Sequence, residues 1–261
     1  MARRVSLVIA DTESYVLANN AIEQCLRGFD FHEVLIFTDK PELWPRYRTH
    51  RIDRIQTIED YNNLMISTVP FHVETEFFIV AQFDGFILNG AAFSAEFYDF
   101  DYIGAPWPST AYEHFRVGNG GFSWRSRRLA VAAAGMAGFR DPTDSEDAFI
   151  GRVLRVALEN RHQCRFPDED TARRFSYEME LPTGPVFGFH GLMHLPLIYR
   201  NNLTYLFDHL PTRVIEQKRS VLASRINELD EGSISLFWDL YRARLQTIKS
   251  TNQSTLPHAS S

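Results

Sequence analysis

The sequence predicts an α/β fold built on a mostly parallel sheet with helices on its faces. One observation is size, because 261 residues with 44% hydrophobic side chains are enough for a large core. A second is the alternation of strand-like runs, at residues 5–10 and 33–38, with helical patterns. The third is the run EFFIVAQF at residues 76–83, whose nearly unbroken apolar character is typical of a strand buried on both faces.

The first part of the chain alternates strands and helices. A strand is expected at Val5–Ala10, which is a β-branched apolar run. Ser14 can then cap a helix in which apolar residues recur at helical spacing. Residues 33–38 repeat the strand pattern, and residues 57–66 have a helical pattern that ends before Pro70. This alternation favours a parallel sheet.

The middle of the chain continues the same alternation. The buried run at residues 76–83 is followed by a short expected strand at 100–103 and a glycine-rich segment at 118–121. Helices are expected at 127–137, which is alanine-rich, and at 146–160, which begins with two acidic residues.

The last part of the chain is expected to be helical. Residues 212–229 and 234–248 show apolar side chains at helical spacing. Residues 250–261 are rich in Ser, Thr, Asn and Pro, which favours a disordered tail. We therefore predict one domain over residues 1–249, followed by the tail 250–261.

Composition excludes several classes of protein. The formal net charge is −6, whereas nucleic-acid binding needs a basic surface, so we expect no nucleic-acid partner. The apolar runs fall well short of the roughly 20 residues that a membrane-spanning helix needs. The start of the chain lacks the pattern of a secretory signal, so we expect a cytoplasmic protein. Cys25 and Cys164 match no metal-binding spacing, which excludes zinc held by cysteines.

A few residues could carry chemistry, although each also has a structural interpretation. Asp84 follows a central strand, at the edge where open α/β sheets bind ligands, but an aspartate in a turn looks the same. Glu146 and Asp147 could act as bases or favour the start of a helix. His190 could ligate a metal or pack as a buried histidine. The glycines at 118–121 allow close approach of a ligand, but their spacing matches neither phosphate-binding loop.

Five motifs in order resemble a known family. They are FDYIGAPW at 100–107, VGNGGFSWRSRR at 117–128, SEDAFI at 145–150, FSYE at 175–178 and FGFHG at 187–191. Together they resemble a bacterial glycosyltransferase-like family catalogued as a domain of unknown function, over most of the chain. The resemblance implies a GT-A fold, in which a nucleotide-sugar-binding α/β half is joined to an acceptor half around a mixed, mostly parallel sheet.

The resemblance also implies a metal site. Gln82 to Asp84 stand where GT-A enzymes carry an aspartate-x-aspartate motif, whose last acid holds a divalent cation on the donor diphosphate. Asp84 keeps that carboxylate, whereas Gln82 departs from the motif and could contact the ribose or base without a second negative charge. His190 falls where some GT-A enzymes place a histidine ligand. Mn²⁺ or Mg²⁺ is the expected cofactor, since hard cations prefer oxygen and Mn²⁺ also accepts imidazole.

Donor-binding residues follow from the resemblance in the same way. Asp11 and Thr12 end the first strand, where a GT-A fold contacts the uracil or ribose, although they could equally cap the next helix. Asn119, Gly120 and Gly121 would line the donor sugar or the acceptor, because glycines allow the backbone to approach closely.

The catalytic base is expected at the start of the helix at 146–160. Glu146 and Asp147 resemble the acidic pair of inverting GT-A enzymes, in which one carboxylate takes the proton of the acceptor hydroxyl. We predict Asp147 as the base, with Glu146 as the alternative. Trp107 could stack on an acceptor sugar or be a core aromatic residue beside Pro106.

The function predicted from the resemblance is glycosyl transfer of the hexosyltransferase type. A sugar would move from a nucleotide diphosphate donor, with UDP-sugars favoured, to a glycan acceptor in cell-surface polysaccharide biosynthesis, with inversion and a divalent metal. Peripheral membrane association is compatible with this function.

Two alternatives stay open. Gln82 suggests a catalytically degenerate GT-A domain that binds a nucleotide sugar or glycan. A sugar nucleotidyltransferase would also have carboxylates at strand ends, but Val5–Ala10 runs directly into Asp11 without the glycine-rich, lysine-containing signature of that class.

Overall fold

The computed structural model of the chain describes residues 4–108 and 114–254. Its internal contacts divide the chain into two compact units, residues 1–191 and 192–261. This differs from the single domain predicted over residues 1–249. The reason is that hydrophobic spacing identifies a helix with one buried face but not the core in which that face is buried.

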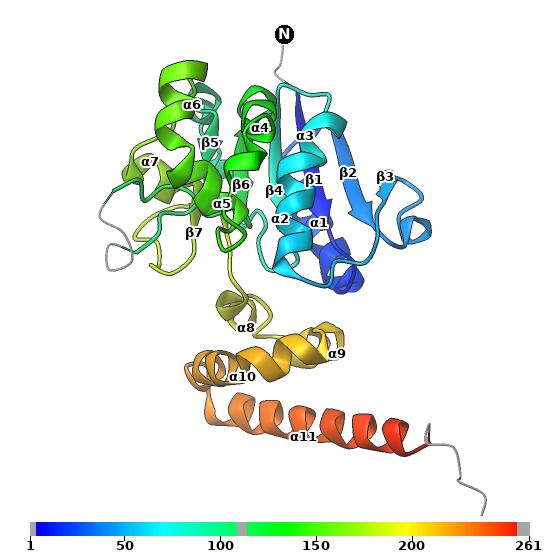
Figure 1. Cartoon of the computed structure of the whole chain (residues 1–261). Helices are drawn as coiled ribbons and strands as arrows, with labels where there is room; N and C mark the ends of the chain where they lie inside the picture. Colours follow the sequence, from blue (N-terminus) through cyan, green and yellow to red (C-terminus); the bar gives the residue numbers. More distant parts are fainter. Residues whose placement is uncertain (1–3, 109–113, 255–261) are drawn as a thin grey trace, which may run out of the picture. The chain divides into compact units, whose positions relative to one another are not determined.

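The first unit contains a six-stranded mixed sheet with the order β3-β2-β1-β4-β6-β5 (Figure 1). Its strands are β1 (Val5–Ala10), β2 (Glu33–Thr38), β3 (Arg48–Arg51), β4 (Phe77–Ala81), β5 (Tyr102–Ile103) and β6 (Ser123–Ser126). Strand β1 pairs in parallel with β2 and β4, β2 pairs in parallel with β3, and β6 is antiparallel to β4 and β5. The predicted α/β fold with a mostly parallel, mixed sheet is confirmed, and the arrangement is compatible with a GT-A-like fold.

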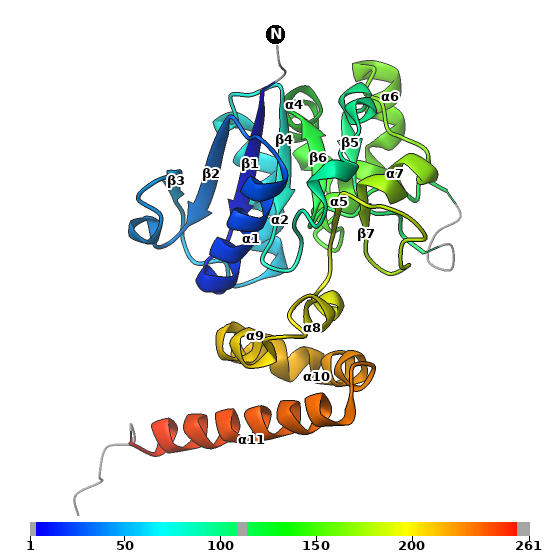
Figure 2. The ribbon, with the colours of Figure 1, turned by 180° about the vertical axis from the view of Figure 1, so that it is seen from behind.

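Helices cover both faces of this sheet. Helix α1 lies on one face and helices α2 and α3 on the other, as the two opposite views show (Figures 1 and 2). The α-helices of the unit are α1 (Tyr15–Gly28), α2 (Ile58–Ser67), α3 (Val69–His72), α4 (Arg127–Ala134), α5 (Glu146–Ala148), α6 (Arg155–His162) and α7 (Glu169–Phe175). Short 3₁₀ helices cover Pro41–Leu43, Gly90–Ala92, Ala95–Asp99 and Ala137–Phe139, and a π-helix covers Phe149–Val153. A second, two-stranded parallel sheet pairs β7 (Ser176–Tyr177) with β8 (Gly188–Phe189).

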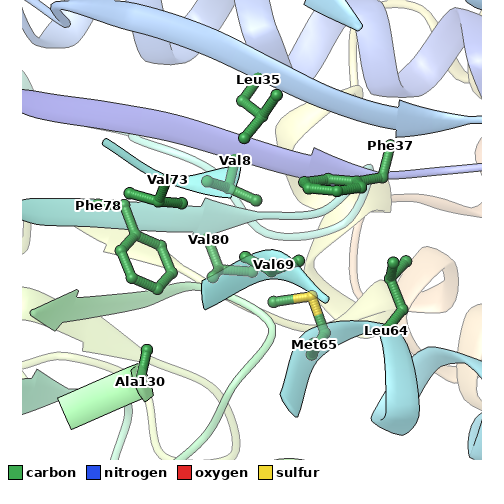
Figure 3. Packing of buried hydrophobic residues seen from close by; sticks show 10 residues of the cluster. All are labelled: Val8, Leu35, Phe37, Leu64, Met65, Val69, Val73, Phe78, Val80 and Ala130. Carbon is green, nitrogen blue, oxygen red and sulfur yellow. The ribbon is translucent and has the colours of Figure 1, made fainter. Parts of the chain in front are cut away.

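One hydrophobic cluster lies between the sheet and helices α2, α3 and α4 (Figure 3). Alternate residues of β1, β2 and β4 point into it, as the period of two along a strand requires. Each large aliphatic or aromatic side chain buried there contributes about 1.5–3 kcal/mol of transfer free energy. The cluster consists of Val8, Leu35, Phe37, Leu64, Met65, Val69, Val73, Phe78, Val80 and Ala130.

A cluster of aromatic rings connects the motif segments to the sheet. Phe122 stacks on Phe175 at the end of α7, with ring centroids 5.2 Å apart. Phe187, just before β8, lies 5.6 Å from Phe175 and 5.4 Å from Phe93. Phe187 is fully buried, and so are Phe122 and Phe175. The FSYE and FGFHG segments are therefore held at fixed positions beside the glycine-rich segment.

The second unit is a small group of helices. They are a 3₁₀ helix at Leu192–His194, α8 (Leu195–Ile198), α9 (Leu203–His209), α10 (Thr212–Asn227) and α11 (Glu231–Ser254). Leu206, Leu222 and Phe237 are fully buried in it. The helices predicted at 212–229 and 234–248 are confirmed. Helix α11 reaches Ser254, so residues 250–254 of the predicted tail are helical, while residues 255–261 lie outside the described residues.

Over the described ranges 4–108 and 114–254, no helix is long and apolar enough to cross a membrane.

Candidate functional site

The candidate site lies at the carboxyl ends of β1 and β4. These strands are neighbours in the sheet, but the chain leaves β1 through α1 toward β2, which pairs with β1 on the side away from β4. The connecting helices therefore lie on opposite faces, and open α/β sheets bind ligands at such a switch point. Asp11 and Thr12 follow β1, and Gln82 and Asp84 follow β4. Because Ile9 is in register with Ala81, these side chains start at the same edge of the sheet.

A tight turn fixes Asp84. The N–H of Gln82 donates to the carbonyl of Gly85 at 2.9 Å, and the N–H of Gly85 donates back to the carbonyl of Gln82 at 3.0 Å. The carbonyl of Asp84 accepts a hydrogen bond from the N–H of Gly191 at 2.8 Å. Gly191 has a φ of 120°, a conformation that favours glycine. This glycine explains the last position of the FGFHG motif, because it connects the segment after β8 to the turn after β4.

His190 joins the residues of the turn. Its Nδ1 lies 3.0 Å from Oε1 of Glu178, and its Nε2 lies 3.2 Å from Oε1 of Gln82. The same Nε2 lies 3.8 Å from Oδ1 of Asp84. The amide nitrogen of Gln82 donates to the hydroxyl of Tyr61 at 2.6 Å, so Gln82 uses both ends of its amide group within the protein. The structure therefore brings the three predicted residues Gln82, Asp84 and His190 together.

The surroundings of His190 favour its charged form. Burial alone would lower the pKa of the imidazole, but the hydrogen bond to Glu178 and the charges of Asp84, Glu178 and Asp147 outweigh it and raise the pKa to about 9. Without a ligand, His190 is therefore an imidazolium at neutral pH. A cation bound at Nε2 would have to replace that proton.

The glycine-rich segment lies between His190 and Asp147. A Cβ atom on Gly121 would stand 2.1 Å from Nε2 of His190, and one on Gly120 would stand 2.2 Å from Oε1 of Glu146. The N–H of Gly120 donates to Oδ2 of Asp147 at 3.1 Å. The glycines are therefore required for a close approach, but the groups that approach them are side chains of the site itself, and contact with a donor sugar or acceptor stays a prediction.

Glu146 is a buried ion-pair partner. Its side chain accepts two hydrogen bonds from Arg125, at 2.9 and 2.8 Å. Both residues are buried, with Glu146 3% exposed and Arg125 1% exposed. The backbone N–H of Glu146 donates to Oδ1 of Asn62 at 3.0 Å. A carboxylate held in this way does not face a cleft that an acceptor could enter. The geometry therefore favours Asp147 over Glu146 as a base.

Asp147 is held in a defined orientation but is only half-buried. Its Oδ2 accepts the hydrogen bond of the Gly120 N–H. Its Oδ1 accepts a hydrogen bond from the N–H of Ala148 at 2.8 Å and another from the hydroxyl of Ser145. Asp147 stands in the first turn of α5, as predicted. Its carboxylate is thus held against the glycine-rich segment at 118–121.

Asp11 and Thr12 make the contacts of a capped turn. Oδ1 of Asp11 accepts hydrogen bonds from the N–H groups of Glu13 and Ser14, at 2.9 and 2.7 Å. The hydroxyl of Thr12 accepts from the N–H of Ile55 at 3.0 Å. Burial raises the pKa of the Asp11 carboxyl to about 6, although the two backbone hydrogen bonds lower it. Asp11 thus binds the two residues just before α1, whereas Thr12 binds Ile55 rather than the start of the helix, and a donor contact stays a prediction.

The raised pKa of Asp11 predicts a stabilising substitution. The folded state holds the proton of Asp11 more tightly than the unfolded state, so ionisation between about pH 4 and pH 6 costs stability. Asp11→Asn keeps the accepting oxygen and removes the charge. We expect it to raise the free energy of unfolding by on the order of 1 kcal/mol at about pH 7.5, with a smaller gain at about pH 5. Urea unfolding at both pH values measures this, with the exposed Asp53→Asn as control. An equal gain at the two pH values would contradict it.

Trp107 and Asn119 both support the glycine-rich segment. Trp107 is half-buried, and its ring lies so close to Gly118 that a Cβ atom there would stand 2.2 Å from it. The N–H of Trp107 donates to the carbonyl of Arg116 at 2.7 Å. Oδ1 of the buried Asn119 accepts a hydrogen bond from the N–H of Gly121 at 3.2 Å. Stacking of Trp107 on an acceptor sugar stays a prediction.

Sequence reasoning did not single out three residues that shape the site. Glu178 orients His190, Arg125 binds Glu146, and Tyr61 binds Gln82. Glu178 and Arg125 stand within the motifs FSYE and VGNGGFSWRSRR, which could have indicated them. Their roles depend on partners far away in the chain, which no local pattern identifies.

The donor atoms around His190 fit a divalent cation only in part. Within the described part of the chain, no group of three or more His, Cys, Asp and Glu side chains could hold a metal ion. Asp84 and His190 are two ligands of the expected types, and Glu178 holds the other ring nitrogen, as carboxylates do for metal-bound histidines. The remaining positions would have to come from diphosphate oxygens and water. Two protein ligands are too few by themselves, so Mn²⁺ or Mg²⁺ binding here would depend on oxygen ligands from outside the protein and stays a prediction.

Comparison with protein families adds one finding. A family model described as "Protein of unknown function (DUF5672)" matches residues 46–190, more than half of the chain. The chain belongs to this family. The matched region contains Gln82, Asp84, Asp147 and His190, whereas Asp11 precedes it. Among curated proteins, no sequence matches the chain.

Proposed function

We propose that the chain is a glycosyltransferase that moves a sugar from a nucleoside diphosphate donor to a glycan acceptor. One observation carries the proposal. Asp84, His190, the glycines 120–121 and Asp147 come from four distant segments and meet beside the switch point of an α/β sheet. A structural role for each residue alone would not require them to meet at that edge. UDP-sugars are the favoured donors, and the proposal includes a cytoplasmic location, where nucleotide sugars are made, and a role in surface polysaccharide biosynthesis.

Asp147 is the proposed general base. Its carboxylate accepts the proton of the acceptor hydroxyl while the hydroxyl oxygen forms a bond to the anomeric carbon of the donor. The bond from that carbon to the diphosphate oxygen breaks, and the electron pair leaves with the nucleoside diphosphate. A single displacement of this kind inverts the configuration. Gly120, Ala148 and Ser145 hold the carboxylate in place through the hydrogen bonds described above.

The leaving diphosphate needs a positive partner. Asp84 and His190 would hold a divalent cation, and Glu178 would orient the His190 ring. Such a cation would stabilise the negative charge that develops on the leaving oxygen. Gln82 supplies no charge, and its contacts with Tyr61 and His190 suggest that it positions the imidazole rather than the ribose.

Ligand-dependent stabilisation tests the proposal. We expect UDP together with Mn²⁺ to raise the melting temperature by several degrees, because a ligand at about 100 times its Kd adds about 2.7 kcal/mol. UDP alone or Mn²⁺ alone should raise it less. A panel of UDP-, GDP- and dTDP-sugars is then incubated with the protein, and nucleoside diphosphate release is measured. If no nucleotide stabilises the protein with or without Mn²⁺, the proposal is wrong.

A binding module is the second candidate. Two observations favour it, since Gln82 replaces an acid of the expected motif and the described residues hold no group of three metal-binding side chains. A module would be stabilised by the nucleotide sugar but would not release the nucleoside diphosphate. The same panel therefore separates the two functions.

A further inference from the structure

We infer that Arg125 is a positioning residue that sets the carboxylate of Asp147 against the glycine-rich segment. The tests of this inference that measure turnover rest on the proposed function. Arg125 lies on β6 and is 1% exposed, so it does not reach a ligand directly. Its guanidinium donates to Glu146, to the carbonyl of Gly120 at 3.2 Å and to the hydroxyl of Ser123 at 2.9 Å.

Two routes lead from this guanidinium to Asp147. One runs through Glu146, which precedes Asp147 in the chain and forms two hydrogen bonds with Arg125. The other runs through Gly120, whose carbonyl accepts from Arg125 and whose N–H donates to Asp147. The hydroxyl of Ser123 also donates to the Gly120 carbonyl, at 2.9 Å. A displacement of the guanidinium would therefore move both the residue before the base and the loop that binds it.

A cross-strand partner holds the guanidinium in place. Tyr102 on β5 is in register with Arg125, and its ring centroid lies 5.2 Å from the guanidinium carbon. The hydroxyl of Tyr102 donates to the carbonyl of Gly118 at 2.6 Å. The buried pair Tyr102 and Arg125 thus binds two carbonyls of the glycine-rich segment, those of Gly118 and Gly120. This is a rigid support of the kind that a precisely placed carboxylate needs.

The informative substitution keeps the charge. Removing Arg125 altogether would leave the buried Glu146 carboxylate without a partner, so Arg125→Ala is expected to unfold the protein. Arg125→Lys keeps the positive charge but loses the planar fork that reaches Glu146 and Gly120 together. A displacement of the base of about 1 Å can cost about 100-fold in rate. We expect Arg125→Lys to lower the turnover number for UDP release roughly 10- to 100-fold, with a nearly unchanged KM for the UDP-sugar.

A double-mutant cycle with Asp147→Asn distinguishes positioning from general stability. If Arg125 acts through Asp147, Arg125→Lys slows the wild-type protein but has little further effect in the Asp147→Asn background. The matched control is Arg128→Lys, because Arg128 donates to the buried Asp101 at 2.6 Å. It makes the same change in an ion pair with a buried carboxylate outside the site. We expect this control to lower the melting temperature without lowering the turnover number.

Hydrogen exchange provides a readout that does not depend on turnover. The Gly120 N–H bonds to Asp147, so its exchange in a peptide covering residues 117–124 should accelerate in Arg125→Lys and not in Arg128→Lys. Ser123→Ala, which removes one contact of Arg125, is a second variant if Arg125→Lys does not fold, with a smaller effect in the same direction. Unchanged exchange at this peptide overturns the inference whatever the activity. Absence of turnover in the wild-type protein would instead overturn the proposed function. If the losses of turnover from Arg125→Lys and Asp147→Asn add up in the double mutant, Arg125 does not act through Asp147 and the inference is overturned.

Discussion

Asp147→Asn is expected to lower the rate of nucleoside diphosphate release at least about 100-fold, with nearly unchanged donor affinity. The base acts on the proton of the acceptor, or of water in its place, only as the new bond forms. An amide in the same position cannot take that proton. Donor affinity is expected to depend instead on Asp84 and His190, the groups proposed to bind the diphosphate through a cation.

The hydrogen bonds of Asp147 predict a second, smaller effect of this substitution. Both oxygens accept from donors, so the amide nitrogen of an asparagine would face either Gly120 or the donors at Ser145 and Ala148. Losing one such bond costs about 1 kcal/mol, which lowers the melting temperature by a few degrees. Asp144→Asn makes the same change of charge three residues earlier and serves as control. A folded Asp147→Asn protein with full turnover would show that Asp147 only favours the start of the helix.

Most of the fold could be predicted because its central strands are apolar. The bounds predicted for β1 and β2 match the structure, and the run at 76–83 contains β4 (Phe77–Ala81). Strand β3 has the sequence RTHR, which shows no apolar alternation, because it pairs only with β2 at the edge of the sheet. Strand β6 has the sequence SWRS and forms by antiparallel pairing with β4 and β5, which no local pattern indicates.

The helix predicted at 146–160 shows the limit of periodicity. Its apolar spacing identified a helical segment, and the structure has helix from Glu146 to Ala148 and again from Arg155 to His162. Between them, Phe149–Val153 form a π-helix, which widens the turn. The wider turn shifts the direction of the side chains that follow it. Apolar residues in a helix recur at spacings of three or four residues, so their spacing in the sequence does not reveal where a π-helix occurs.

The candidate site could be predicted as a set of positions but not as a set of contacts. Asp84 and Asp147 were identifiable because each stands at the end or start of an element. The sequence does not show that Glu146 forms the ion pair rather than Asp147, because the two residues are adjacent and chemically alike. The difference arises from Arg125 on β6, a strand that the sequence did not predict.

Asp84→Asn is expected to abolish the Mn²⁺-dependent part of the stabilisation by UDP. Asp84 is the only carboxylate of the Gln82 to Asp84 turn, and its Oδ1 lies 3.8 Å from Nε2 of His190. An amide in its place cannot supply the negative charge that a hard cation prefers. Disturbing a metal ligand or its support costs about 10- to 100-fold in affinity, so donor affinity in the presence of Mn²⁺ should fall at least that far.

Two measurements on Asp84→Asn separate metal binding from folding. The variant should still fold, because the backbone of residue 84 keeps its bond to Gly191, but its melting temperature without ligand should fall somewhat, because the Asp84 charge favours the imidazolium of His190. Titration of UDP with Mn²⁺ and with EDTA should give the same weak affinity for the variant, whereas the wild type should bind more tightly with Mn²⁺. Asp39→Asn, just after strand β2, which β1 separates from β4, is the control and should keep the Mn²⁺ effect. If Asp84→Asn keeps the Mn²⁺ effect as well, Asp84 does not hold the cation, and the metal assignment is wrong.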